Sequence, residues 1–161
     1  MGTASKVLVG VVTLEIKCPI GGTYRNVGYT EDGVTVDYGV TKVEINVEEE
    51  TYPIKQTIQT ESLKVTANLA ESSLANMHIA MAGSVLAGNV LSIGSGVDKE
   101  MAIRLVGKNE LGYDKTWEIP QAVASGSVGM PYRKNEKTVV PVEFTAIKGS
   151  EAIATVTDST S

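Results

Sequence analysis

Apolar and polar residues alternate along several segments of this chain, and this alternation constrains the fold more than any other feature. Side chains of a β-strand point in turn to opposite faces, so a period of two predicts strands that are buried on one side only. Valine, isoleucine and threonine, which favour strands, are abundant in these segments. The alternating segments are 34–38, 43–47, 63–69, 101–105 and 138–147.

Two of these regions, 34–47 and 54–69, predict one long β-hairpin. The sequence EEETYP at 48–53 interrupts the alternation between them and is typical of an exposed loop at a hairpin tip. The apolar positions change from even to odd numbers near 39–41, which predicts a turn or bulge there, and a second change lies at 61–62. The pair Asp32-Gly33 predicts a tight turn ahead of the first strand.

One segment, between Glu71 and Ala82, has the period of an α-helix. Leu74, Met77 and Met81 lie on one face of it. We expect this face to pack on the apolar side of the hairpin, while the polar side stays hydrated.

The remaining segments are shorter. We expect strands at 90–93 and 115–119, with Trp117 facing the core, and the segment 121–129 consists of small and polar residues. The last predicted strand, 138–147, has Val140, Val142 and Phe144 on one face. Pro141 within it cannot donate a hydrogen bond to a sheet, so its position should lie at an edge or a bulge.

The length of 161 residues, 42% of them hydrophobic, fits a single domain. We expect residues 1–23 to form an N-terminal arm with a short strand around Val7–Val12, and residues 149–161 to form a flexible C-terminal tail. The predicted fold class is mainly β with one α-helix, a β-sandwich or half-barrel with a long β-hairpin and open sheet edges.

Composition argues against several functional classes. No apolar run approaches the ~20 residues that span a bilayer, and the start of the chain is a poor signal peptide. The net charge of −5 and the scattered basic residues do not predict a nucleic-acid-binding surface. The single cysteine, Cys18, allows no internal disulfide and is interpreted as a small hydrophobic residue.

Motifs of catalysis and metal binding are absent or incomplete. Gly107-Lys108 is followed by Asn109, where a phosphate-binding loop needs Ser or Thr, and no Gly-x-Ser-x-Gly motif occurs. His78 is the one histidine, so a hydrolase that uses it stays an alternative. The acidic run at 48–50 could hold a weak calcium site but is better explained as a hydrated loop. We therefore expect no enzyme, no cofactor and no metal.

Three segments together resemble the major tail proteins, or tail tube proteins, of siphophages. VGYTEDGV at 27–34 is similar to the opening motif of that family. QTESLKVTANLAESSL at 59–74 is similar to the strand that leads into the family's helix, and KTVVPVEFTAI at 137–147 to its closing strand. The resemblance covers residues 24–147 in the family's order.

This resemblance implies a structural subunit that forms hexameric rings, stacked into a tube for DNA delivery, with the hairpins joined into a continuous inner β-barrel. It implies a position in the virion tail after assembly in the host bacterial cytoplasm. The implied partners are further copies, a tape-measure protein, and tail terminator and tip proteins, with no membrane anchor. DNA passes through the lumen without specific binding.

Two sets of residues are expected to serve this assembly. Those expected to face the lumen are Asp37, Glu44, Asn46 and Glu48. Those expected in a loop between rings are Glu49, Glu50, Thr51, Tyr52 and Pro53. The alternatives to this function are the tube of a contractile tail or of a related injection or secretion machine, and a monomeric β-sandwich binding module.

Overall fold

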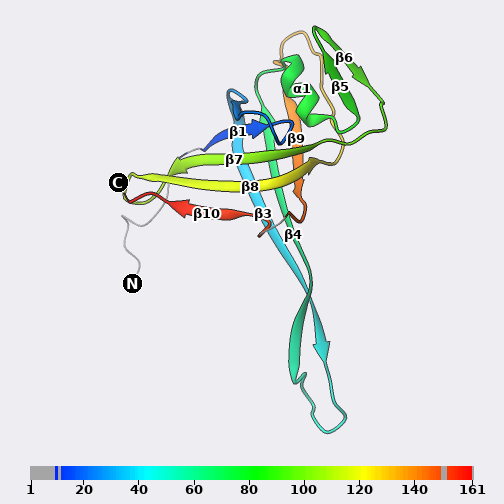
Figure 1. Cartoon of the computed structure of the whole chain (residues 1–161), viewed down its shortest axis with the longest axis vertical. Helices are drawn as coiled ribbons and strands as arrows, with labels where there is room; N and C mark the ends of the chain where they lie inside the picture. Colours follow the sequence, from blue (N-terminus) through cyan, green and yellow to red (C-terminus); the bar gives the residue numbers. More distant parts are fainter. Residues whose placement is uncertain (1–9, 11, 150–151, 161) are drawn as a thin grey trace.

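The computed structural model describes residues 10, 12–149 and 152–160. Within them, one helix and ten strands follow one another along the chain (Figure 1). Their bounds are β1 (Thr13–Lys17), β2 (Arg25–Asn26), β3 (Thr30–Ile45), β4 (Lys55–Leu69), α1 (Leu74–Ala80), β5 (Ser84–Ala87), β6 (Val90–Ile93), β7 (Glu100–Lys108), β8 (Asp114–Ala124), β9 (Val140–Ala146) and β10 (Thr155–Asp158).

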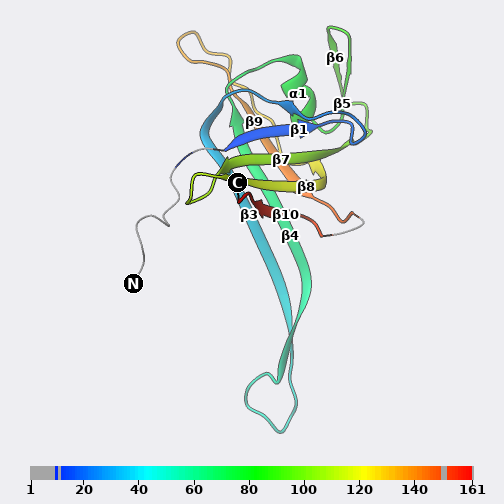
Figure 2. The same cartoon turned by 60° about the vertical axis from the view of Figure 1, so that its left-hand side comes forward.

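Eight of these strands form one antiparallel sheet that is folded over on itself. Its order is β2-β1-β7-β8-β9-β4-β3, and β10 pairs with β8 beside this path. In Figures 1 and 2, β1, β7, β8 and β10 run across the molecule, whereas β3, β4 and β9 run along its length. The fold is therefore mainly β with one short helix, as the sequence predicted.

The core lies between the two parts of this sheet. Leu14, Ile103 and Leu105 from the crossing strands belong to the same buried cluster as Val65 and Phe144 from the lengthwise strands. The helix completes this core in part as expected: Ile79 and Ala80 belong to the same cluster and Met77 packs against it, whereas Leu74 is exposed. Along the backbone, α1 lies beside β9 and the small β5–β6 hairpin.

β8 is the strand at which the sheet divides. Its residues 115–118 pair with β10, and its residues 122–124 pair with β9. The strand expected at 115–119 is longer than predicted, because β8 continues into the small, polar segment as far as Ala124, with Ala122 and Ala124 buried. Small side chains carry a weak strand signal, and pairing with β9 fixes this segment instead.

The pair Asp32-Gly33 does not form the expected tight turn. Both residues have positive φ, 61° and 77°, and they form a two-residue bulge inside β3, opposite an uninterrupted β4. The left-handed conformation that suits a hairpin turn also suits such a bulge, so the local sequence does not separate the two.

The two ends of the chain differ from expectation where the structure describes them. The stretch around Val7–Val12 lies mostly outside the described residues, and the strand of this region is β1, whose Leu14 and Ile16 are buried in the core. In place of a flexible tail, residues 155–158 form β10 on the edge of β8. Pairing with a distant strand, which no local pattern reveals, orders both segments.

Two expectations for the last long strand are confirmed. Val140, Val142 and Phe144 lie on one face of β9 and are buried. Pro141 pairs with Asn68 of β4 and lies in the part of β9 that β8 does not reach. Within the described residues α1 is the only helix, and its seven residues are too few to cross a bilayer.

Candidate assembly interface

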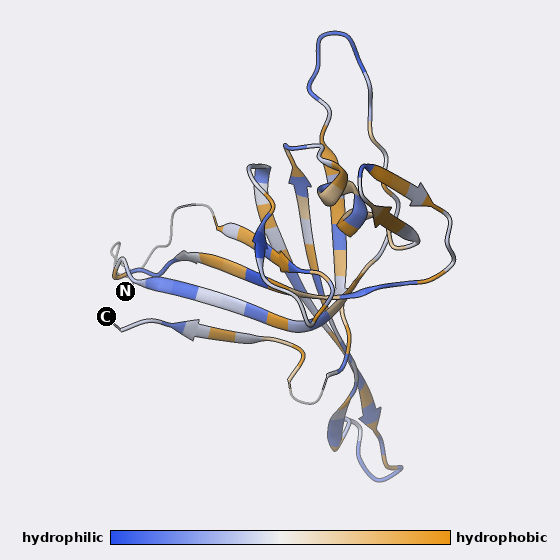
Figure 3. Cartoon of the chain, turned by 45° about the horizontal axis from the view of Figure 1, so that its top comes forward, coloured by the Kyte–Doolittle hydropathy of each residue, from blue (hydrophilic) through white to orange (hydrophobic). Residues whose placement is uncertain are grey.

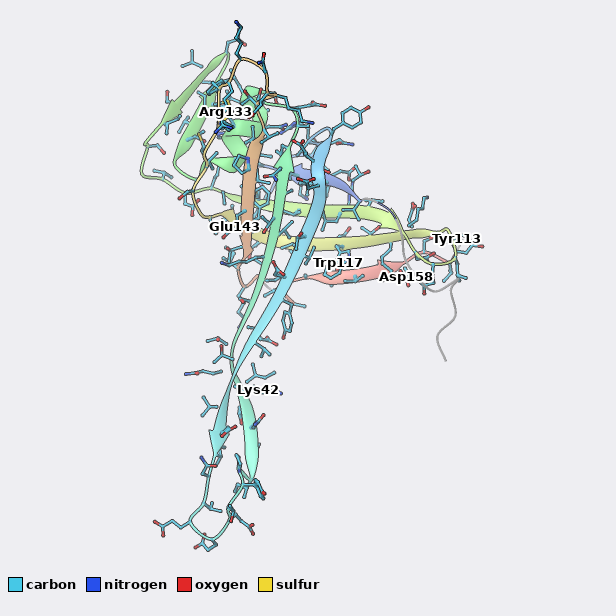
Figure 4. All side chains as sticks on the ribbon, turned by 180° about the vertical axis from the view of Figure 1, so that it is seen from behind. Lys42, Tyr113, Trp117, Arg133, Glu143 and Asp158 are labelled. Atoms are coloured by element: carbon cyan, nitrogen blue, oxygen red, sulfur yellow. The ribbon has the colours of Figure 1, made fainter. Side chains whose placement is uncertain are left out.

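The β3–β4 hairpin extends well beyond the rest of the molecule. β3 and β4 pair along their whole length, but β9 pairs only with residues 64–69 of β4. Every residue from 37 to 62 is exposed. Residues 39–45 and 55–62, here called the ribbon, therefore form a bare two-stranded ladder (Figure 1, and near Lys42 in Figure 4). The predicted long hairpin with a polar loop at its tip is confirmed.

This hairpin leaves two strand edges open. β3 pairs with β4 alone, so the outer edge of its 16 residues has no neighbouring strand in the sheet. The opposite edge, along residues 55–63 of β4, is equally open. An unpaired edge presents a row of N–H and C=O groups that can pair with another chain.

Apolar and polar residues alternate along the ribbon, as the colours of Figure 3 show, and apolar side chains are exposed on both of its faces. Strand alternation places Val40 and Ile58, the partner of Lys42, on one face, and Val43 and Ile45 on the other. Their exposed fractions are between 42% and 51%. A two-stranded ribbon alone in water is marginally stable at best, so we expect another chain to pack against this element.

The side of the hairpin base that faces away from the core is polar. Its residues are Thr35, Asp37, Lys64, Thr66 and Glu143, here called the polar face. They lie in adjacent register on β3, β4 and β9, and Lys64 Nζ lies 3.5 Å from Glu143 Oε1. The polar face is a hydrated surface of mixed charge with threonine between the charges.

The four residues expected to face a lumen do not share one face. Asp37 belongs to the polar face, whereas Glu44, seven positions along β3, points to the opposite side and accepts a hydrogen bond from Gln56 Nε2 at 3.1 Å. Asn46 and Glu48 lie in the exposed loop between β3 and β4.

Residues 46–54, here called the tip loop, contain every residue that was expected between rings. The loop is closed by backbone hydrogen bonds from Glu50 N to Val47 O, at 3.3 Å, and from Ile54 N to Ile45 O, at 3.0 Å. All of its side chains are exposed. Among the described residues no cluster of potential ligands suits a metal ion, and this includes the acidic run of this loop.

His78 lies near Ser84, but the pair does not have the arrangement of a catalytic dyad. His78 Nδ1 is 3.3 Å from Ser84 Oγ. That hydroxyl is buried and lies 2.7 Å from Met81 O, a carbonyl to which it donates, while Lys99 Nζ donates to Ser84 Oγ at 3.1 Å. Ser84 thus connects α1 to β5. The sequence does not indicate this role, because the acceptors of its hydroxyl are the backbone carbonyls of His78 and Met81.

Cys18 is half-buried, and burial raises the pKa of its thiol despite the nearby positive charges of Lys99 and Arg25. A thiol that stays protonated is a poor nucleophile. Its interpretation as a small hydrophobic residue therefore agrees with its packing against the core.

Comparisons with known proteins identify the fold. Neither a protein-family model nor a curated protein matches the sequence. Among solved structures, a chain of the anti-feeding prophage tube-terminating cap matches with a TM-score of 0.57 and 13% identity, over 99% of this chain and 97% of that one.

Two further assemblies contain similar chains. In the sheath–tube complex of the extracellular contractile injection system PVC, the TM-score is 0.53 at 13% identity, over 99% of this chain and 100% of the other. In the C6-symmetric tail of a gene transfer agent particle, it is 0.51 at 6% identity, over 92% and 95%. At such identities the likeness shows the fold. These matches are components of tails and injection machines rather than enzymes.

Proposed function

We propose that this chain is the structural subunit of the tube of a phage tail or of a phage-like injection particle, and that it forms stacked hexameric rings around a conduit. The observation that carries this proposal is the bare ribbon, which has open edges and exposed apolar side chains on both faces. Identical neighbours supply the missing pairing and cover.

Ring closure follows from the two different open edges of the hairpin. The edge of β3 in one subunit meets the edge of residues 55–63 in β4 of the next. Since β3 and β4 are antiparallel and a ring keeps all subunits in one orientation, this contact is also antiparallel. A contact between two different surfaces, repeated by rotation, closes into a ring with a continuous inner barrel.

In this arrangement the polar face lines the lumen. Its two threonines and three charged side chains give a hydrated wall, and the wall is slightly negative because Asp37 and Glu143 outnumber Lys64. A wall rich in cations would hold DNA phosphates by counterion release, so the acidic bias of the chain, 19 acids against 14 bases, favours passage. In this arrangement Glu44 would point away from the lumen, because it lies on the face of β3 opposite Asp37. For Asn46 and Glu48 the lumen position stays a prediction.

The kind of particle is a finer question. The sequence motifs at 27–34 and 137–147 favour a siphophage tail, in which the tube contains a tape-measure protein, ends at terminator and tip proteins and ejects DNA. The likeness to the PVC sheath–tube complex favours a contractile machine instead. A gene for a sheath protein beside the gene for this chain, together with copurification of a sheath with the tubes, would support the contractile machine.

Electron microscopy of the purified protein tests the proposal directly. We expect wild-type protein to form rings or tubes in negative stain. A variant with Val40→Glu and Ile58→Glu, on the ribbon face opposite the side of the polar face, should stay monomeric. Both side chains lie in solvent in the free subunit, so the free energy of unfolding should change by less than ~0.5 kcal/mol. In the assembly the new charges would be buried without partners.

A matched control is Leu111→Glu, which places an acid on an exposed apolar position of the β7–β8 turn, away from the ribbon. This variant should assemble as the wild type does. Wild-type protein that remains a monomer at high concentration and in all salts would reject the proposal and favour a monomeric binding module.

A further inference from the structure

The tip loop combines negative charge with exposed apolar side chains. Its residues 46–54 contain three carboxylates, Glu48, Glu49 and Glu50, and no cation. Tyr52 is 80% exposed, and Val47 and Ile54 are exposed beside it. Such a surface fits a partner that offers cations and aromatic rings.

A surface of the opposite character lies at the other end of the same strands. Tyr29 precedes β3, and its carbonyl accepts a hydrogen bond from the N–H of Ala70, which follows β4, at 2.8 Å. The segment 131–139 leads into β9 at this end, where Val140 pairs with Leu69. Tyr29, Tyr132, Arg133 and Lys134 are here called the upper rim.

The upper rim is basic, aromatic and exposed. Tyr29 and Tyr132 are 80% and 76% exposed and, with Tyr52 of the tip loop, are the three most exposed tyrosines of the described residues. Arg133 contacts Glu136 at 3.0 Å but remains open to solvent. Lys137, just behind the rim, contacts Glu31 at 3.1 Å and so fixes the segment to the start of β3.

The two surfaces cannot meet within one subunit. Figure 4 shows Arg133 at the end of the molecule opposite the tip of the hairpin. β3 and β4 run between the two ends, so a second copy displaced along the strands brings its tip loop onto the rim of the first. The contact joins acids to cations and leaves the edges of β3 and β4 free for neighbours in the ring.

We propose that the upper rim is the receptor for the tip loop of a second copy of this chain, and that this contact joins one ring to the next. The inference rests on the proposed tube function and names the two surfaces that meet between rings. Exposed aromatic rings provide apolar contact area, and complementary charges fix the register and exclude other arrangements.

Charge reversal on each surface tests this contact. Reversing the tip loop, with Glu48→Lys, Glu49→Lys and Glu50→Lys, places cations opposite the basic rim. Reversing the rim, with Arg133→Glu and Lys134→Glu, places acids opposite the acidic loop. At low salt, where charges are least screened, we expect each variant to form rings but no tubes in negative stain. The variant that combines both reversals should form tubes again.

Single substitutions with the same charge change provide the matched control. Lys134→Glu should raise the protein concentration at which tubes form by on the order of tenfold, whereas Lys148→Glu, on an exposed position after β9, should leave it unchanged. Circular dichroism of the free subunits verifies that each variant folds.

The possible outcomes separate this inference from the tube function. Wild-type tubes together with normal tubes from either reversal, or no recovery in the combined variant, overturn the rim as receptor but keep the tube. Reversals that abolish the rings as well place the contact inside a ring and also overturn the inference. Wild-type protein without rings or tubes rejects both proposals.

Discussion

His78 illustrates how a single side chain can be polar, accessible and yet structural. It lies in the last turn of α1, close to Ser84, while Lys99 donates from Nζ to Met81 O at 2.5 Å and to Ala82 O at 3.1 Å. Lys99 thus satisfies carbonyls at the end of the helix, where a cation is favourable. A second cation at His78 would be repelled by it.

The pH dependence of stability should report this arrangement. Burial, and secondly the charge of Lys99, lower the pKa of His78 below its ordinary value of 6.5. The folded state therefore binds fewer protons than the unfolded state just below pH 6.5, so the contribution of His78 to stability is complete above that pH and is lost as the pH falls.

Urea unfolding at a series of pH values measures this effect. We expect the free energy of unfolding of the wild type to decline below pH 6.5 relative to that of His78→Gln, whose side chain does not titrate. Identical pH profiles for the two proteins would show that neither burial nor Lys99 lowers the pKa of His78 in the folded state.

Residue by residue, the sequence predicted apolar burial better than polar burial. The alternation alone placed Val140, Val142 and Phe144 on one face of a strand, and this face is buried. Asn76 was not singled out, although it is fully buried, donates from Nδ2 to Val27 O and Glu71 O at 2.9 and 2.8 Å, and accepts from Arg25 at 2.9 Å. These partners lie up to 51 residues away, so no local pattern indicates them.

At the scale of elements, the sequence predicted the hairpin but not the structural cause of the change in its apolar positions. The change of apolar positions from even to odd suggested a bulge, and a bulge exists, but its extra residue is Gln59 in β4. β3 itself continues without interruption through Val43 and Ile45. The apolar positions change from even to odd where β3 leaves the core. In the ribbon, Val43 and Ile45 therefore lie on the side of β3 that carries polar residues at the base of the hairpin.

Shortening the hairpin in two steps tests what each part does. Replacing residues 46–54 by Asn-Gly joins the paired residues Ile45 and Lys55 by a two-residue turn and keeps the ribbon. Replacing residues 42–59 by Asn-Gly joins Thr41 to Thr60 and removes most of it. We expect rings without stacking from the first variant and monomers from the second.

Both variants should unfold with nearly the wild-type free energy, within ~0.5 kcal/mol in urea, because every deleted side chain is exposed in the free subunit. A large loss of stability in either variant would mean that the ribbon supports the fold of the monomer. Rings from the longer deletion would show that the edges near the base are sufficient for closure.

At the scale of the whole molecule, charge is distributed by position along the strands. Acids occupy the tip loop and cations the upper rim. The polar face between them combines threonines with charges of both signs. The sequence predicted the class of fold and the hydrated side of the hairpin. It did not predict the crossing of the two strand groups, the small β5 strand or the division of β8, since all three depend on pairing between distant segments.

A lumen-side charge change tests the orientation of the polar face. Tubes assembled from a Thr35→Lys, Asp37→Lys variant should retain short double-stranded DNA that wild-type tubes release, because phosphates displace counterions from the new cations. Cosedimentation at ~50 mM and ~200 mM salt measures this, and retention should fall steeply with salt. Asp98→Lys, an exposed position before β7, is the control for added charge. Equal retention by both variants would place the polar face outside the channel.

Because only neighbouring subunits cover the ribbon, the first steps of tube assembly should be slow. When two free subunits associate, each loses conformational entropy in its ribbon, and the pair gains only one contact. A subunit that joins a completed ring gains contacts on several sides at once. Polymerisation of this chain should therefore show a lag that preformed ends remove, and a cell can keep the subunit dissolved until a template presents the first ring.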